Sequence, residues 1–485
     1  MRLSMISAAV RTRMLRGVVG LGIVIATVLR IVAAFDEFWL DEIWSLMAFV
    51  RIPHTYCEIF TFHHDNNHYL VTLWMDVVGG GARNWFVYRI PSIVASVGTV
   101  ILAAVIARRW GRVAAACASW FCATSFVMNV YGSEARGYAL AGFFSLAAFL
   151  FLERFLQRPN VWASLAFSLA TMLGALSHLT FIQFYCGALA CSIVSFAMSE
   201  ATWKRALFRL VQLHALPISF FLALYLVDVR AMRIGGGDPY RVGDVVASSL
   251  ALAVGCFSEQ PVIVIGAALI AAAAAVASLV LLHHEKSHLW LLCTVGFVVA
   301  PAVLLSVKPP PLLYVRYFYL NLIFLQILFS FLVARTVEFG RLGKYVAVIG
   351  VALVLAGNAK LTADFLAVGR GHYLDALEYV NEHTPGSTIR LAGDDDFDNT
   401  TYLGFYVDYL PKGHVFEYTN FHKPASPGAP PPDWLLVHNQ QRPFRPAPTL
   451  TASGEDYVLV QKYPCGRLSG YQFALYQRVQ MSGRR

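Results

Sequence analysis

The sequence predicts a polytopic α-helical membrane protein with a small α/β domain at its C-terminal end. Of its 485 residues, 57% are hydrophobic and only 14% are charged, whereas a soluble domain carries about 25% charged residues. Apolar stretches of about 20 residues, the length that a membrane-spanning helix needs, recur over the first three quarters of the chain. The net charge of +9 does not indicate a nucleic-acid partner, because the basic residues lie in short runs between apolar stretches.

Basic residues set the expected orientation of the spans. Arg11, Arg13 and Arg16 precede the first apolar run, which we interpret as an uncleaved signal anchor with a cytoplasmic N-terminus. The even-numbered connections that follow all contain basic residues, which favours about eleven spans. After the first, the predicted spans are residues 86–107, 113–131, 138–156, 161–178, 180–198, 207–227, 261–282, 288–306, 316–334 and 343–360.

The residues from 361 to 485 differ in composition from residues 1–360, the predicted membrane domain, and are expected to form a small domain outside the cytoplasm. Apolar and polar residues alternate over 473–479, which suits a strand with one wet face. The predicted elements are a helix over 374–383, strands over 387–392, 433–437, 457–461 and 473–479, and proline-rich loops over 424–432 and 443–448.

The sequence contains eight cysteines, and none forms a CxxC motif. Cys57, Cys256 and Cys465 fall in or near predicted non-cytoplasmic segments, where one disulfide among them could form. The spacing does not choose the pair.

Four carboxylates open the predicted first outer loop, residues 36–85. Asp36, Glu37, Asp41 and Glu42 stand at the mouth of a span and among aromatic residues. Ionisable groups at a membrane boundary are costly to desolvate and tend to be functional. A partly buried carboxylate in such a place suits a general base, so Asp41 and Glu42 are the candidate catalytic residues. The alternative is the solvated start of a loop.

The same loop continues with a histidine-rich run over residues 63–68. Histidine and aspartate together are compatible with zinc, but their spacing matches no standard site. A metal cluster and a polar, hydrogen-bonded loop are both open interpretations. A divalent metal is therefore compatible with the sequence but not required, and no metal ligand is assigned.

Two further outer segments combine arginine with tyrosine. Glu134, Arg136 and Tyr138 stand at one predicted helix start, and Arg316 and Tyr317 stand at another. Arginine at a helix N-terminus favours a phosphate, although an arginine at a span boundary can also snorkel to the interface. Acidic and cationic groups at one membrane surface suit a substrate with a lipid tail and a phosphate.

Six short motifs, in this order along the chain, together resemble the GT-C membrane glycosyltransferases. The nearest resemblance is to the bacterial branch related to protein O-mannosyltransferases and aminoarabinose or galacturonic-acid lipid A transferases. It covers residues 14–360 well and the C-terminal domain only in general character. The family has two prolines after its histidine, where this chain has Tyr69. The motifs are Asp41-Glu42, Asn67-His68-Tyr69-Leu70, Tyr88-Arg89-Ile90-Pro91-Ser92, Ser133-Glu134-Ala135-Arg136-Gly137-Tyr138, Ser177-His178 and Arg316-Tyr317.

The resemblance implies an inverting glycosyltransferase in the bacterial inner membrane. It would move a sugar from a polyprenyl-phosphate donor to an acceptor hydroxyl at the outer face, on a glycolipid such as the lipid A core, a polysaccharide or a protein. Asp41 would be the catalytic base, and Glu42 would orient the loop or the acceptor. Arg136, Arg316 and Tyr317 would hold the donor phosphate without a metal. The remaining substrate-binding candidates are His68, Tyr69, Arg89, Glu134, Tyr138 and His178.

Two other functions remain open from the sequence. A lipid or sugar transporter or flippase often has duplicated halves and polar groups at the membrane midplane, whereas here the halves do not mirror each other. The notable polar groups lie at the predicted outer face. The exceptions are Arg30 and Asn321, which are both near span ends. A non-catalytic assembly or receptor subunit would use the C-terminal domain for binding, but would leave Asp41 and Glu42 unexplained.

Overall fold

The computed structural model describes residues 2–52, 55–236, 240–307, 309–423, 430–439 and 442–479, with side chains from residue 15 onward. The chain divides into two compact units that are not consecutive in sequence. Two stretches of the predicted first outer loop belong with the C-terminal residues. The first unit holds residues 1–34, 53–78 and 86–363, and the second holds residues 35–52, 79–85 and 364–485.

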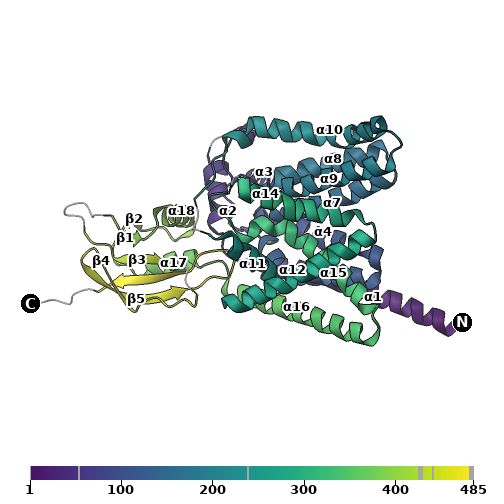
Figure 1. The fold of residues 1–485 in the computed structure, drawn as a ribbon. Helices are drawn as coiled ribbons and strands as arrows, with labels where there is room; N and C mark the ends of the chain where they lie inside the picture. Colours follow the sequence, from purple (N-terminus) through teal and green to yellow (C-terminus); the bar gives the residue numbers. More distant parts are fainter. Residues whose placement is uncertain are drawn as a thin grey trace, which may run out of the picture. The chain divides into compact units, whose positions relative to one another are not determined.

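The first unit is a bundle of helices (Figure 1). In the described part of the chain, nine helical segments are long and apolar enough to cross a membrane, in agreement with a polytopic membrane protein. They contain α1 (Arg2–Ala33), α4 (Phe86–Ala107), α7 (Tyr138–Gln157), α9 (Phe181–Ser199), α10 (Trp203–Val227), α12 (Pro261–His284), α13 (His288–Thr294) with α14 (Ala300–Val307), α15 (Tyr319–Val337) and α16 (Gly340–Val368).

The predicted count of about eleven spans is not confirmed. The segment predicted over 113–131 is helical but interrupted at Ser125, and the segment predicted over 161–178 is a helix of 17 residues. Neither is a continuous helix of about 20 residues, the length that a span needs. These helices are α5 (Arg112–Thr124), α6 (Phe126–Tyr131) and α8 (Val161–Ser177), and two short apolar helices that the sequence analysis missed are α3 (Tyr69–Val78) and α11 (Val242–Ala253).

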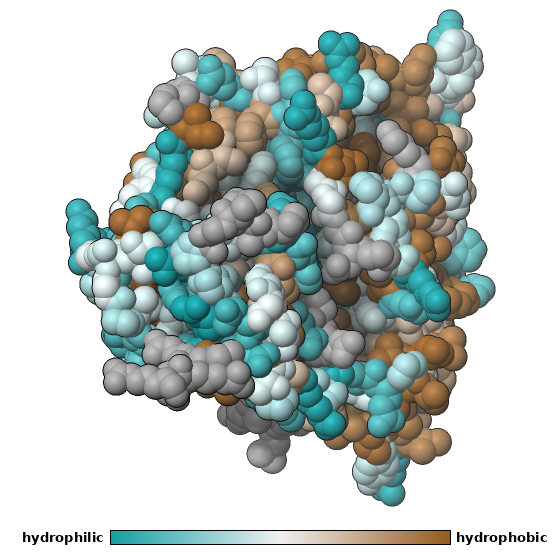
Figure 2. Space-filling view, turned by 90° about the vertical axis from the view of Figure 1, so that its left-hand side faces the viewer, coloured by the Kyte–Doolittle hydropathy of each residue, from teal (hydrophilic) through white to brown (hydrophobic). Residues whose placement is uncertain are grey.

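The helices of the first unit differ in how much of their surface the bundle covers. In α15, 78% of the most apolar window is buried, whereas in α12 only 17% is buried. The large apolar side chains Val262, Leu269 and Ile270 of α12 are 82%, 65% and 69% exposed. Water disfavours such exposure, so lipid is the fitting solvent for this face. Figure 2 shows hydrophobic side chains gathered over part of the surface in view.

A charged residue inside α1 is bound by its neighbours. Arg30 has no exposed surface, and its guanidinium donates to Ser96 Oγ at 2.6 Å and to the Cys122 carbonyl at 3.0 Å. Buried charges in membrane helices typically pair with polar groups in this way. We therefore interpret Arg30 as a residue that fastens α1 to α4 and α5, and not as part of a transport path.

The second unit is built on a six-stranded sheet with the order β2-β1-β3-β6-β5-β4. β1 pairs in parallel with β2 and β3, and the other pairs are antiparallel. This confirms the small α/β domain. Its elements are α17 (Tyr373–His383), β1 (Thr388–Gly393), α18 (Asp396–Tyr406), β2 (Val415–Asn420), β3 (Trp434–His438), β4 (Thr449–Ala452), β5 (Glu455–Tyr463) and β6 (Phe473–Arg478).

Three of the four predicted strands, β1, β3 and β6, are mostly buried, whereas β5 is mostly exposed or half-buried. β3 is central, and Trp434, Leu435 and Leu436 are each at most 2% exposed, as expected for a strand covered on both faces. β2 lies at the sheet edge with alternately exposed residues, and the sequence analysis missed it together with β4 and α18. Residues 424–429 of one predicted loop lie outside the described residues.

All eight cysteines are free thiols. This holds for Cys57, Cys256 and Cys465, among which the sequence allowed one disulfide. Cys57 belongs to the first unit and is exposed, whereas Cys465 belongs to the second and is buried.

Candidate functional site

Four segments of the first unit bring aromatic and basic side chains together at helix ends. The ring centres of His68, before α3, and His178, at the end of α8, are 4.7 Å apart. Tyr138, which begins α7, lies 4.3 Å from His178. Tyr317, in the turn before α15, lies 6.3 Å from His178. We call His68, Arg136, Tyr138, His178, Arg316 and Tyr317 the basic cluster.

Gly137 lets the start of α7 approach the end of α8. A Cβ atom at this position would lie 1.7 Å from the carbonyl oxygen of Ser177, so only glycine fits there. The Gly137 amide also donates to His68 Nδ1 at 2.7 Å. The glycine between Arg136 and Tyr138 therefore joins three segments of the basic cluster.

His68 presents a buried N–H group. Because its Nδ1 accepts from the Gly137 amide, the neutral ring carries its proton on Nε2. Within the described chain, His68 Nε2 is buried and has no hydrogen-bond partner. Burial, and then the charges of Arg136 and Arg316, hold the pKa of His68 well below its ordinary value. Burial lowers the pKa of His178 to about 3, so both rings are neutral at physiological pH.

The two arginines of the basic cluster lie against aromatic rings. The guanidinium of Arg316 lies 4.5 Å from the ring centre of Tyr314, and that of Arg136 lies 5.9 Å from the ring centre of Tyr138. Arg136 also donates to the Asn66 side chain. Contact with a ring orients a guanidinium. The cluster thus presents oriented guanidinium groups of the kind that bind anions.

Three further predicted substrate-binding residues are buried in the first unit. Tyr69 is buried at the start of α3, where its hydroxyl donates to Asp228. Arg89 in α4 has no exposed surface and donates to the Ala34 carbonyl at 2.9 Å. Glu134 is fully buried in the turn before α7. Direct contact of these residues with a substrate stays a prediction.

The histidine-rich run over 63–68 is bound to the segment after α10. His63 Nδ1 lies 2.5 Å from Asp228 Oδ1, and Asp65 accepts from the Gly235 amide at 3.1 Å. Burial raises the pKa of Asp65, but its hydrogen bonds to His64 and to the Gly235 amide, together with the nearby charge of Arg136, outweigh burial and lower it. Among the described residues, no member of the run belongs to a group of three side chains close enough to share a metal ion. The contacts are those of a hydrogen-bonded loop.

The two predicted catalytic carboxylates lie in the second unit and differ in environment. Both belong to α2 (Leu40–Ser45). Glu42 has no exposed surface, and its Oε2 accepts from the Trp39 amide at 3.3 Å, which caps the start of α2. Asp41 is half-buried. Glu42 thus fixes the helix, whereas Asp41 retains surface that a substrate can reach.

Glu37, His372 and Asp375 form a second acidic group in the same unit. Their possible ligand atoms lie within 4.8 Å of one another. Burial raises the pKa of Glu37 to about 8. Glu37 accepts from the Leu374 amide at 3.2 Å, and His372 Nε2 lies 2.8 Å from the Val368 carbonyl. These contacts explain the group as the cap of α17, so we assign no metal to it.

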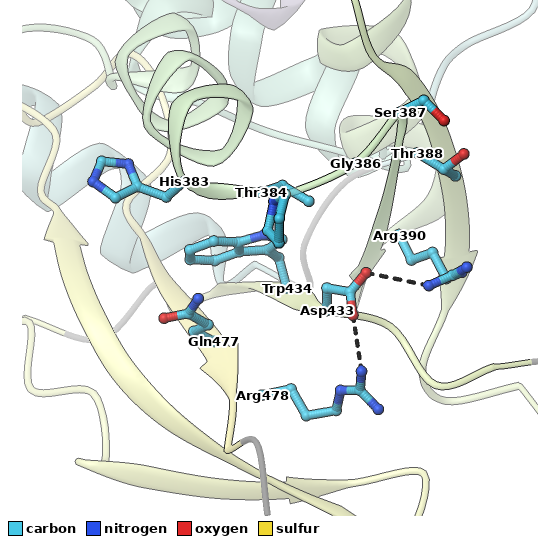
Figure 3. Close-up of a pocket in the computed structure, with 11 residues that line it drawn as sticks. His383, Thr384, Gly386, Ser387, Thr388, Arg390, Asp433, Trp434, Gln477 and Arg478 are labelled. Atoms are coloured by element: carbon cyan, nitrogen blue, oxygen red, sulfur yellow. Dashed lines mark hydrogen bonds and ion pairs between the residues drawn. The ribbon is translucent and has the colours of Figure 1, made fainter. Parts of the chain in front are cut away.

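A cavity of about 320 Å³ lies in the second unit (Figure 3). Asp433 stands in its wall between Arg390, 3.5 Å away, and Arg478, 3.0 Å away. The indole N–H of Trp434 donates to Thr384 at 2.8 Å, so this ring is fixed within the wall. The predicted site residues are not part of the lining, and no motif in the sequence marks this cavity.

Comparison with known proteins supports the fold. No family profile and no curated protein sequence matches the chain. The chain is similar to the apo crystal structure of ArnT from Cupriavidus metallidurans, with 14% identity, a TM-score of 0.51, and coverage of 83% of this chain and 86% of ArnT. ArnT bound to undecaprenyl phosphate gives 14% identity, a TM-score of 0.48, and coverage of 97% and 99%. An oligosaccharyltransferase from Archaeoglobus fulgidus gives 12% identity, a TM-score of 0.45, and coverage of 82% of this chain and 62% of that chain. The chain has the fold of ArnT.

Proposed function

We propose that this chain, with its GT-C fold, is a membrane glycosyltransferase that transfers a sugar from a polyprenyl-phosphate donor to an acceptor hydroxyl. The observation that carries the proposal is the basic cluster. Arg136 and Arg316 are oriented by aromatic rings, and the buried His68 Nε2–H has no acceptor among the described residues. A phosphate would accept from all three groups.

The basic cluster fits the leaving group of this reaction. As the bond between the sugar and the phosphate breaks, negative charge develops on the departing phosphate oxygen. Preorganised donors stabilise such charge most effectively where water is excluded. Arg136, Arg316 and the His68 Nε2–H would supply these donors, with Tyr317 beside them. The guanidinium charges can perform this role, so a divalent metal is compatible with the proposal but not required.

Asp41 would act as the general base. It would accept the proton of the acceptor hydroxyl while that oxygen attacks the anomeric carbon from the side opposite the phosphate, so that the anomeric configuration inverts. The products are the glycosylated acceptor, polyprenyl phosphate and a proton on Asp41. Glu42 would keep Asp41 in place through the cap at Trp39.

The location and partners follow from the same proposal. ArnT, whose fold this chain shares, has been crystallised with undecaprenyl phosphate, a lipid of the class that we propose here. The enzyme would lie in the bacterial inner membrane with its N-terminus in the cytoplasm and its second unit in the periplasm. The acceptor would be a glycolipid such as the lipid A core, a polysaccharide or a protein.

The test is turnover of defined donors by the purified protein in nanodiscs. Wild type and Asp41→Asn are incubated with a panel of polyprenyl-phosphate sugars, with and without an envelope extract as acceptor, and free polyprenyl phosphate is measured by mass spectrometry. We expect the wild type to consume one donor and Asp41→Asn to spare it. If both folded proteins spare every donor in the presence of the extract, the transferase proposal is wrong.

A further inference from the structure

The acidic segment, residues 36–42, is bound along its length by residues more than three hundred positions away in the second unit. Asp36 accepts from the Arg370 amide at 2.6 Å, and Glu37 accepts from the Leu374 amide at 3.2 Å. These contacts fix the start of the segment. They leave open what fixes the backbone next to Asp41.

Two tyrosine hydroxyls bind that backbone. Tyr402 accepts from the Leu40 amide at 3.1 Å, and Tyr406 donates to the Phe38 carbonyl at 2.5 Å. Leu40 is the first residue of α2, and the first amides of a helix have no partner within the helix. Tyr402 therefore caps α2 from outside at the residue directly before Asp41.

The two tyrosines form one rigid surface of α18. They are four residues apart, which places them on the same helix face, and their rings lie 6.3 Å apart at an angle of 7°. Tyr402 is 2% exposed and Tyr406 is fully buried. Hydrophobic packing explains why the two rings are buried. It does not explain why tyrosine stands here in place of phenylalanine, because a buried hydroxyl lowers stability unless it is hydrogen-bonded.

A further network backs this surface. The ring of Tyr373 stacks on Tyr402 with centres 3.5 Å apart. The Tyr373 hydroxyl is hydrogen-bonded to His438, whose Nδ1 lies 2.7 Å from Asp394. The stack is therefore also held by side chains outside the acidic segment, which limits the freedom of Tyr402 to move.

We propose that Tyr402 and Tyr406 are positioning residues for the reaction: they bind the backbone on either side of Trp39 and thereby fix the direction in which Asp41 points. This inference rests on the proposed function, because it assumes that Asp41 is the base. It assigns the C-terminal unit a part in catalysis that does not depend on acceptor recognition. Small displacements of a catalytic group lower rates steeply.

The test compares Tyr402→Phe and Tyr406→Phe with Tyr457→Phe in the full-length protein. Tyr457 is a matched control, because its buried hydroxyl donates to the Pro432 carbonyl at 2.9 Å in the same unit but does not touch the acidic segment. Two quantities are measured: steady-state kcat and KM for the consumed donor, and hydrogen exchange of peptides that cover residues 36–45.

We expect Tyr402→Phe and Tyr406→Phe each to lower kcat about 10-fold with an unchanged donor KM, and to speed exchange over 36–45. Tyr457→Phe should change neither. In an Asp41→Asn background, Tyr402→Phe should lower the residual rate no further, because it acts through Asp41.

Wild-type kcat in both variants would overturn the positioning role, and so would a fall in rate that persists undiminished in the Asp41→Asn background. If the wild type consumes no donor, the proposed function fails instead, and the exchange measurement still decides whether the two hydroxyls hold the segment.

Discussion

The basic cluster and the acidic segment hold their charged groups in opposite ways. In the basic cluster, aromatic rings orient Arg136 and Arg316, and two buried neutral histidines add no charge. In the acidic segment, hydrogen bonds to the backbone fix the chain around Asp41, and the Glu42 carboxylate caps the start of α2. The first arrangement suits binding of an anion that arrives already charged. The second suits a single carboxylate that must change protonation during the reaction.

If this comparison is right, variants of the two regions separate kinetically. Changes in the basic cluster should weaken binding of the phosphate and also slow turnover, whereas changes in the acidic segment should slow turnover and leave binding intact. The following variants test this separation.

The largest effect should come from Asp41→Asn. Loss of a general base lowers kcat about 1,000-fold, whereas the neutral side chain leaves the backbone contacts of α2 in place. Turnover is followed as release of polyprenyl phosphate. Glu42→Gln is the neighbouring control: its carbonyl can still accept from the Trp39 amide, so we expect a loss of only a few-fold. Equal losses in both variants would show that Asp41 has no special role.

Replacement of either arginine by lysine should weaken polyprenyl phosphate binding about 10- to 100-fold, because lysine keeps the charge but loses the planar fork that binds phosphate. Arg136→Lys and Arg316→Lys are compared by calorimetry or by native mass spectrometry. Arg112→Lys, an exposed arginine at the start of α5, is the control. Unchanged affinity for polyprenyl phosphate in both variants would show that the phosphate does not bind at the basic cluster.

The buried donor of His68 should contribute less than an arginine. His68→Ala removes one hydrogen bond to a charged group, which corresponds to about a 10-fold loss of affinity. His68→Gln, which can again offer an N–H, should recover part of it. The exposed His383 serves as the control in a His383→Ala variant. If the His68→Gln and His68→Ala variants bind polyprenyl phosphate equally weakly, the Nε2–H of His68 does not bind the phosphate.

The smallest effect concerns stability and pH. The folded pKa of His178 is about 3, below its ordinary value of 6.5, so the unfolded chain binds the extra proton first. The contribution of neutral His178 is therefore complete above pH 6.5 and is lost as pH falls toward 3. Between pH 6.5 and 5.5 this amounts to about 1 kcal/mol. His178→Asn should show a correspondingly flatter fall of Tm over that interval. An identical fall in both proteins would mean that His178 is not kept neutral.

The sequence predicts helices better than it predicts spans. Apolar runs define the helices of the bundle, but whether 161–178 crosses a membrane depends on a few residues at its ends, and Ser125 breaks a run that is continuous in hydrophobicity. The residues of the basic cluster could be selected from the sequence, because they all stand in connections that the charge pattern assigns to one face.

The contacts that position Asp41 could not be predicted from the sequence. Tyr402 and Tyr406 lie more than 360 positions away, in a helix that begins with Asp396 and Asn399 and so looks like a turn. Local propensity could not show that two parts of the first outer loop belong to the C-terminal unit. Long-range contacts of this kind leave no periodic signal in either segment.

The central claim, that one region binds the phosphate of the donor and the other holds the catalytic base, is tested most directly by measuring polyprenyl phosphate affinity and donor turnover side by side for wild type, Asp41→Asn and Arg136→Lys in nanodiscs. We predict that Asp41→Asn binds as tightly as the wild type with almost no turnover, and that Arg136→Lys binds about 10- to 100-fold more weakly. Normal binding by Arg136→Lys together with weak binding by Asp41→Asn would contradict the account.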